Sequence, residues 1–131
     1  MNSLFVKVPV VVKAKLTEKL KTRMIDEYTK VAEQMELELK QINIDRQREL
    51  DAHPEQSEQI ARFFGNEIMQ RQQRRGEALS RKETTQKLAI GAEIIQGTLE
   101  HQVELKVGDN FREVMNREIL VEDDKVIAIR G

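Results

Sequence analysis

The chain has 131 residues, of which 34% are charged and 4% aromatic, and its formal net charge is -1. A large compact core is excluded because bulky aromatic fillers are so scarce, and the near-neutral charge argues against binding nucleic acid or anionic lipid by overall attraction. The sequence contains no cysteine, which excludes disulfides, thiolate catalysis and thiolate metal sites.

The first predicted element is a β-strand that ends near residue 15. The residues of one face are apolar in the two-residue period of a half-buried strand; they are Val6, Val8, Val10, Val12 and Ala14. The other face carries Lys7, Pro9, Val11, Lys13 and Lys15. Proline cannot donate a hydrogen bond to a neighbouring strand, so we expect this strand to run along a sheet edge at Pro9.

A long helix is predicted from Thr17 to about Asp51. The Thr17 hydroxyl can cap its first turn, and Glu18 is favourable at the positive end of the helix dipole. Apolar residues continue along one face; they are Leu20, Met24, Tyr28, Val31, Met35, Leu39 and Ile42. These positions repeat about every eleven residues, which is typical of a nearly straight helix pair.

A second helix is predicted after a tip at residues 52–57, where Pro54 can begin the return. Its matching face carries Ile60, Phe64, Ile68, Arg71, Arg75 and Leu79. Folding back at the tip pairs positions whose numbers add up to about 110. Val31 should then lie by Leu79, and Arg71 and Arg75 should reach Glu36 or Glu38.

The last part of the chain is predicted to form short strands. Alternation over 99–107 indicates one strand, Asn110 can cap a single helical turn, and Asp123-Asp124 joins two further strands in a tight hairpin. The expected fold is α+β. A long antiparallel helical hairpin (17–88) is inserted into a small antiparallel β domain built from residues 1–16 and 89–131.

Three segments are similar to the YlqD family of small bacterial proteins. They are Val10–Glu18, Gly97–Phe111 and Val126–Arg130, and the similarity is most specific around Val107 to Phe111. The resemblance implies the same layout of strands and helices. It implies no activity, ligand or catalytic residue. Some members are encoded beside genes for ribosome maturation and transfer-RNA modification, which implies a link to RNA.

A basic stripe on the second helix is the main candidate site. It comprises Arg71, Arg74, Arg75, Arg81 and Lys82. These side chains could neutralise nucleic-acid phosphates, but they could equally form a solvated face paired with acids of the first helix. No aromatic residue lies among them to stack on bases. The solvated face is the favoured interpretation.

Two further features of the second helix concern its partners. Phe63 and Met69 lie off the apolar face and are candidate contacts to a second chain. Gly65 and Gly76 each cost about 1 kcal/mol relative to alanine in a helix. They are accounted for either by close approach of the two helices or by bending of the hairpin, and the sequence does not choose between these.

No catalytic, cofactor or metal site is expected. Neither His53 nor His101 has a partner at metal-ligand spacing. Glu122-Asp123-Asp124 is typical of a tight turn, where aspartate is favoured. The favoured function is a non-enzymatic interaction or adaptor protein that binds a protein or a second copy through the hairpin. The alternative is an RNA- or ribosome-associated factor. The chain lacks an apolar run long enough for a signal or membrane segment, so no membrane association and a cytoplasmic location are expected.

Overall fold

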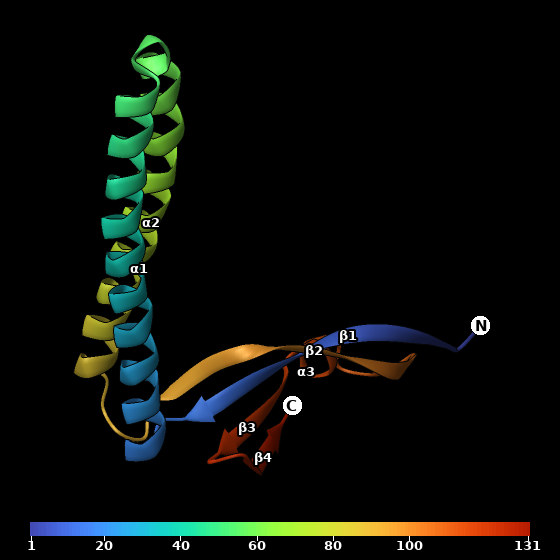
Figure 1. Cartoon of the computed structure of the whole chain (residues 1–131). Coiled ribbons are helices and arrows are strands. Elements are labelled where there is room, and N and C mark those ends of the chain that lie inside the picture. Colours follow the sequence, from blue (N-terminus) through green and yellow to red (C-terminus); the bar gives the residue numbers. More distant parts are fainter. The chain divides into compact units, whose positions relative to one another are not determined.

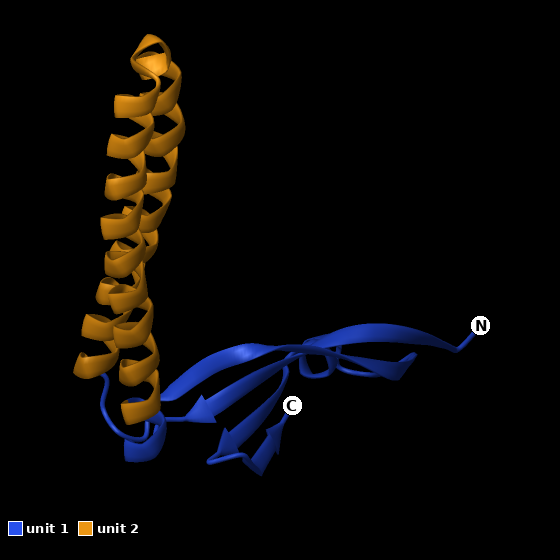
Figure 2. Ribbon diagram, in the orientation of Figure 1, with its two compact units in different colours: residues 1–21, 88–131 blue, residues 22–87 orange.

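The computed structural model describes residues 1–131, and strands from both ends of the chain form its single sheet (Figure 1). The strands are β1 (Ser3–Lys15), β2 (Glu93–Lys106), β3 (Arg117–Glu122) and β4 (Lys125–Arg130). The helices are α1 (Glu18–Ala52), the 3-10 turn η1 (Pro54–Gln56), α2 (Ser57–Lys87) and the short α3 (Phe111–Met115). Two compact units result, residues 1–21 with 88–131 and residues 22–87 (Figure 2). The α+β class with an inserted helical hairpin is confirmed.

The sheet is mixed, whereas an antiparallel sheet was predicted. Its order is β2-β1-β3-β4, and β1 pairs antiparallel with β2 but parallel with β3. The reason is connectivity: β2 carries the chain back to the start of β1, where Ser3 faces Lys106. The segment that contains α3 then returns the chain to Val10, which faces Arg117, so β3 must run in the direction of β1.

The predicted alternation of β1 is confirmed by its burial. Val8, Val10 and Ala14 are buried, and Val114 of α3 is buried with them. The pairing with β3 begins at Val10, so the preceding residue, Pro9, lies where β1 has no neighbour on that side. The expected edge position of Pro9 is therefore confirmed for the first half of β1.

Strand β2 begins at Glu93, well before the predicted start at Leu99. The cause is a β-bulge: Val12 faces Gly97 but Lys13 faces Ile95, so Gln96 is an extra residue. An extra residue reverses the order of inward and outward side chains. The two-residue period is therefore broken at this point, and the first part of β2 is not recognisable from alternation.

The chain leaves the sheet through Leu16, which is fully buried. The Leu16 amide donates to the Ala92 carbonyl at 2.7 Å, and the Gly91 amide donates to the Leu16 carbonyl at 2.7 Å. Gly91 has a φ of 94°, which favours glycine. The Thr17 hydroxyl then accepts from the Leu20 amide at 3.1 Å, which confirms the predicted cap of α1.

The helical hairpin has the predicted register. Arg75 Nε donates to Glu36 Oε1 at 3.0 Å, and Arg71 Nε lies 3.8 Å from Glu38 Oε1. Buried Ala32 and Ala78 fall at positions whose numbers add up to about 110, as do Met35 and Arg75. The turn at His53 and η1 occupies the predicted tip.

The predicted apolar face of α1 is covered at six of its seven positions, and Val31 is the exception. The covered positions are Leu20, Met24, Tyr28, Met35, Leu39 and Ile42. The predicted pair Val31 and Leu79 is exposed, and Ala32 and Ala78 are buried instead. The prediction chose the larger apolar residues Val31 and Leu79, but the neighbouring alanines occupy the contact between the two helices at this position.

The remaining local predictions agree with the structure. The Glu113 amide donates to Asn110 Oδ1 at 3.1 Å, so Asn110 caps α3. Asp123 and Asp124 have φ values of 45° and 68° and connect β3 to β4. Two consecutive positive φ values are typical of the tight turns that match strand twist.

Four charged side chains tie all four strands together on one face of the sheet. Arg130 Nη1 of β4 lies 2.6 Å from Glu93 Oε1 of β2 and 2.9 Å from Glu118 Oε1 of β3. Lys13 Nζ of β1 lies 2.8 Å from Glu118 Oε2. The hydrogen bond from Arg130 lowers the pKa of Glu93, and those from Lys13 and Arg130 lower the pKa of Glu118.

This cluster predicts a loss of stability in acid. Because both carboxyl pKa values are lower in the folded than in the unfolded chain, the unfolded chain binds more protons as pH falls below about 4.3. The stabilisation is therefore complete near neutral pH and is lost as pH drops through the lowered values. Thermal unfolding followed by circular dichroism from pH 7 to pH 3 measures it. Arg130→Gln should flatten this dependence, whereas Arg112→Gln, which removes an exposed arginine without an ion pair, should leave it unchanged.

The two glycines of α2 give a second prediction. A Cβ atom at Gly65 or Gly76 would meet no other atom within 4 Å, so close approach of the helices does not account for either residue. Gly65→Ala and Gly76→Ala should each stabilise the hairpin by roughly 0.5–1 kcal/mol, because alanine loses less backbone entropy in a helix. The helical circular dichroism signal should melt at a higher temperature. An unchanged or lower melting temperature would contradict this.

Candidate interaction surfaces

The five side chains of the predicted basic stripe have three different environments. Some are paired with carboxylates, one is half-buried, and the others are exposed without an ion pair. Arg71 is paired with Glu67 and Glu38, and Arg75 is paired with Glu36. Lys82 is half-buried, in line with the covered positions of α2. Only Arg74 and Arg81 are exposed without a carboxylate within ion-pair distance. They lie two turns apart on one helix face, with Glu77 between them in sequence.

An apolar hollow of the hairpin lies near its tip. A hollow of about 370 Å³ is lined by Glu49, Gln59, Ile60, Phe63 and Phe64. The Phe63 and Phe64 rings meet edge to face, with centroids 5.2 Å apart and planes at 87°. Ile60 is buried, whereas Phe63 keeps 60% of its surface exposed. A large aromatic side chain thus stands in solvent beside an apolar floor.

Met69, the second predicted contact, is also 60% exposed but lies apart from this hollow. It lies six positions after Phe63, so the two side chains point in directions about 120° apart around the helix. Leu37 and Ile44 are exposed on α1. The structure therefore does not bring Phe63 and Met69 into one patch.

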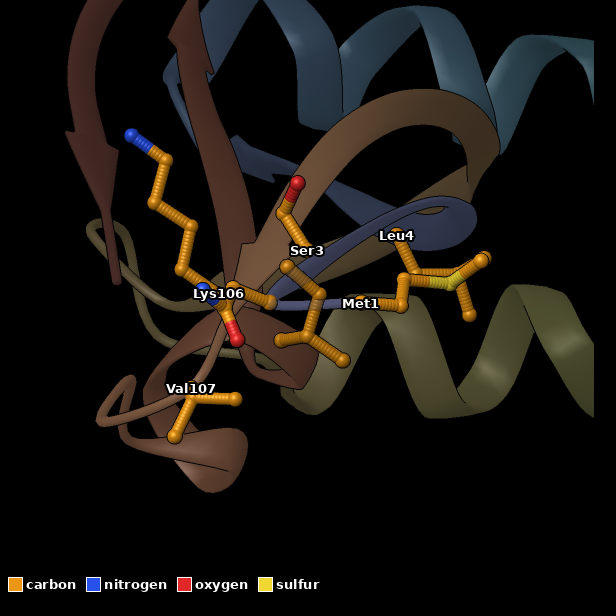
Figure 3. A pocket seen from close by; sticks show the side chains of 7 residues that line it. Met1, Ser3, Leu4, Lys106 and Val107 are labelled. Carbon is orange, nitrogen blue, oxygen red and sulfur yellow. The ribbon is translucent and has the colours of Figure 1, made fainter.

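A second apolar hollow lies where β1 begins and β2 ends. It measures about 280 Å³ and is formed by Met1, Asn2, Ser3, Leu4, Leu105, Lys106 and Val107. Figure 3 shows these side chains around the paired ends of the two strands. Leu4 and Val107 are exposed here. Sequence reasoning did not find this hollow, since it joins residues from opposite ends of the chain.

The titratable residues form no recognisable reaction centre. No three His, Asp or Glu side chains are grouped as metal ligands. His53 lies at the hairpin tip with Nδ1 3.5 Å from Glu55, and His101 is exposed on β2. A hollow of about 210 Å³ beside α3 is lined by Glu104, Asp109, Glu113 and Arg117, with no hydroxyl, thiol, imidazole or amine side chain among its lining residues.

Comparison with known proteins finds a matching family and a similar fold. The model of the YlqD protein family matches residues 4–130. The chain belongs to the YlqD family. A crystal structure of a protein of unknown function from Synechococcus sp. WH 8102 is similar to it, with a TM-score of 0.85 and 24% identity. That similarity covers 98% of this chain and 97% of the other, and it shows the fold. The comparison with curated proteins finds no match.

In this YlqD chain none of the helices combines the length and apolar character needed to cross a bilayer. The family match confirms the resemblance of the three segments named above. The site predictions stay predictions, because neither the comparisons nor the fold assigns a role to any residue. What the structure adds is the separation of paired from unpaired arginines and the hollow beside Phe63.

Proposed function

We propose that this YlqD protein is a non-enzymatic interaction protein and that its hairpin binds another protein at the hollow beside Phe63. The observation that carries the proposal is the exposure of Phe63 next to buried Ile60. Aromatic side chains at the centre of an interface commonly supply much of the binding energy. A partner with an apolar side chain of matching size would cover Phe63 and fill the hollow.

The polar rim of the hollow supports the same proposal. Polar Glu49 and Gln59 line the hollow together with apolar Ile60 and Phe64. A small apolar centre bordered by polar groups is the usual anatomy of a protein interface. Catalysis is not proposed at this hollow, because Glu49 is its one titratable lining residue and no second catalytic group accompanies it.

The test compares two equally exposed residues of one helix. Phe63→Ser and Met69→Ser remove apolar side chains of the same 60% exposure, and only Phe63 lines the hollow. Partners captured by the wild-type chain are identified by mass spectrometry, purified and titrated by calorimetry. Phe63→Ser should weaken binding at least about tenfold, which corresponds to about 1.4 kcal/mol, and Met69→Ser should leave it unchanged.

Two results would contradict the proposed site. One is retention of binding by Phe63→Ser, and the other is an equal loss in both variants, which would indicate a general effect of surface hydrophobicity. Circular dichroism of each variant confirms that the helices are intact before binding is measured. Because Phe63 is mostly exposed, its replacement should leave the helical signal unchanged.

A second candidate function is RNA binding through Arg74 and Arg81. It is favoured by their exposure, by the absence of carboxylate partners and by their position on one helix face. Their number is small, and Arg71 and Arg75 already have acidic partners. The basic stripe therefore supports RNA binding less than Phe63 supports protein binding.

Salt and charge reversal test this candidate. Binding to single-stranded or ribosomal RNA should fall steeply between low and moderate salt, because counterions are released with each phosphate contact. Arg74→Glu with Arg81→Glu should abolish it. Arg62→Glu, a reversal of an exposed arginine on the same helix whose partner is Glu58, serves as the control. Binding that is insensitive to salt or to the double reversal would exclude the candidate.

A further inference from the structure

Strand β2 presents the longest free backbone edge of the sheet. The strand order leaves β2 and β4 at the two edges, and β2 has 14 residues whereas β4 has 6. Between Thr98 and Gln102 every residue of β2 is exposed. Unpaired amide and carbonyl groups along such an edge are a template for another strand.

The direction of the backbone groups defines which part of this edge is open. The Val107 amide donates to the Asn2 carbonyl at 3.1 Å, so the backbone of Val107 faces β1. Backbone groups alternate between the two sides of a strand, so Lys106 and every second residue before it face away from β1. These outward residues are Thr98, Glu100, Gln102, Glu104 and Lys106.

Both ends of the outward series are closed. The Lys106 amide donates to Asp109 Oδ2 at 2.7 Å, and its carbonyl accepts from the Asp109 amide at 3.0 Å. At the other end the bulge at Gln96 interrupts the alternation. The open stretch is therefore residues 98–104, and its centre is His101.

Natural edge strands usually carry protection against pairing, and proline and lysine are two common forms of it. By the same alternation, Lys7 and Pro9 of β1 face away from β2, so a proline without an amide hydrogen closes the other side of the strand pair. Residues 98–104 contain neither proline nor lysine. The contrast between the two sides marks the β2 edge as the one left open.

We propose that two copies of the chain pair antiparallel through residues 98–104 of β2, about a twofold axis at His101. All four open residues then find partners: Thr98 pairs with the partner's Glu104, and Glu100 pairs with the partner's Gln102. On the opposite face, exposed Leu99 lies beside the partner's Val103, so an apolar side chain is covered. A twofold axis makes each contact occur twice.

Repulsion between glutamates disfavours the registers with an axis at Glu100 or Gln102. An axis at Glu100 would set Glu100 against the partner's Glu100, and an axis at Gln102 would set Glu100 against the partner's Glu104. Like charges directly opposite destabilise a strand pair. An axis at Val103 would leave only Gln102 and Glu104 to pair, because the backbone of Lys106 is bonded to Asp109. The pairing involves residues 98–104 alone and does not depend on a partner of the hairpin.

The first test measures mass by sedimentation. The wild-type chain should shift from 15.2 kDa to twice that mass as concentration rises. Gln102→Pro should raise the dimer dissociation constant at least about tenfold, because the lost amide hydrogen faces the partner and not β1. Gln102→Thr keeps the amide and favours strands, so it should dimerise like the wild type. A wild-type chain that stays monomeric, or a dimer unaffected by Gln102→Pro, would overturn the proposal.

The second test determines the register of the strand pair by introducing single cysteines. The natural chain has no cysteine, so each introduced one can link only to its symmetry mate. Residues at the axis form a non-hydrogen-bonded pair with Cα atoms about 4.5 Å apart, within the range of disulfides. Mild oxidation should therefore link His101→Cys into covalent dimers, whereas Val103→Cys, four positions from its own symmetry mate, should stay largely unlinked. Equal or faster linking of Val103→Cys would overturn the register.

Discussion

Strand β1 is the one element on which the rest of the sheet depends. β2 pairs with one side of it and β3 with the other, and β4 joins only through β3. Without β1, the remaining strands would be a lone β2 and a two-stranded hairpin, which are marginally stable in water. Its side chains also supply much of the core, with Val8, Val10 and Ala14 buried and Leu16 following directly. The ion-pair cluster adds a second tie across the same strands.

The helical hairpin is held by weaker and more polar contacts. Its buried apolar residues are few; they are Ala32, Met35, Ile60 and Ala78. At mid-length the seam is filled by Arg71 and Arg75, which pair with acids of α1. Partly exposed ion pairs contribute little to stability each, so the hairpin depends on its length and on many small contributions. This leaves apolar side chains such as Phe63 available on its surface.

The parts of the fold that were predictable from sequence are those set by local chemistry. The side chains of Thr17 and Asn110 cap helices, and Asp123 and Asp124 adopt the positive φ values of a tight turn. The hairpin register followed from the tip position alone. By contrast, the parallel pairing of β1 with β3 depends on how a distant segment returns, and no pattern within either strand encodes it.

The candidate sites were less predictable for a related reason. The sequence places five basic residues together, but whether each is free depends on acids contributed by α1. Phe63 could be identified as lying off the apolar face. Its neighbours in the hollow include Glu49 from the other helix, which only the folded register brings close. The hollow formed by Met1, Leu4 and Val107 joins residues from opposite ends of the chain.

The register of the helical hairpin also affects how β1 and β2 come together during folding. Leu16 and its hydrogen-bond partner Gly91 are roughly 75 positions apart in sequence, and closing so long a loop carries a large entropic cost. Helices form and pair locally, on a faster timescale than distant strands. Once the hairpin is closed, the covered positions Ile25 and Thr85 fall opposite one another by its register. β1 ends ten positions before Ile25 and β2 begins eight positions after Thr85, so a much shorter loop remains to be closed. The inserted helices thus shorten the search by which the two termini find each other.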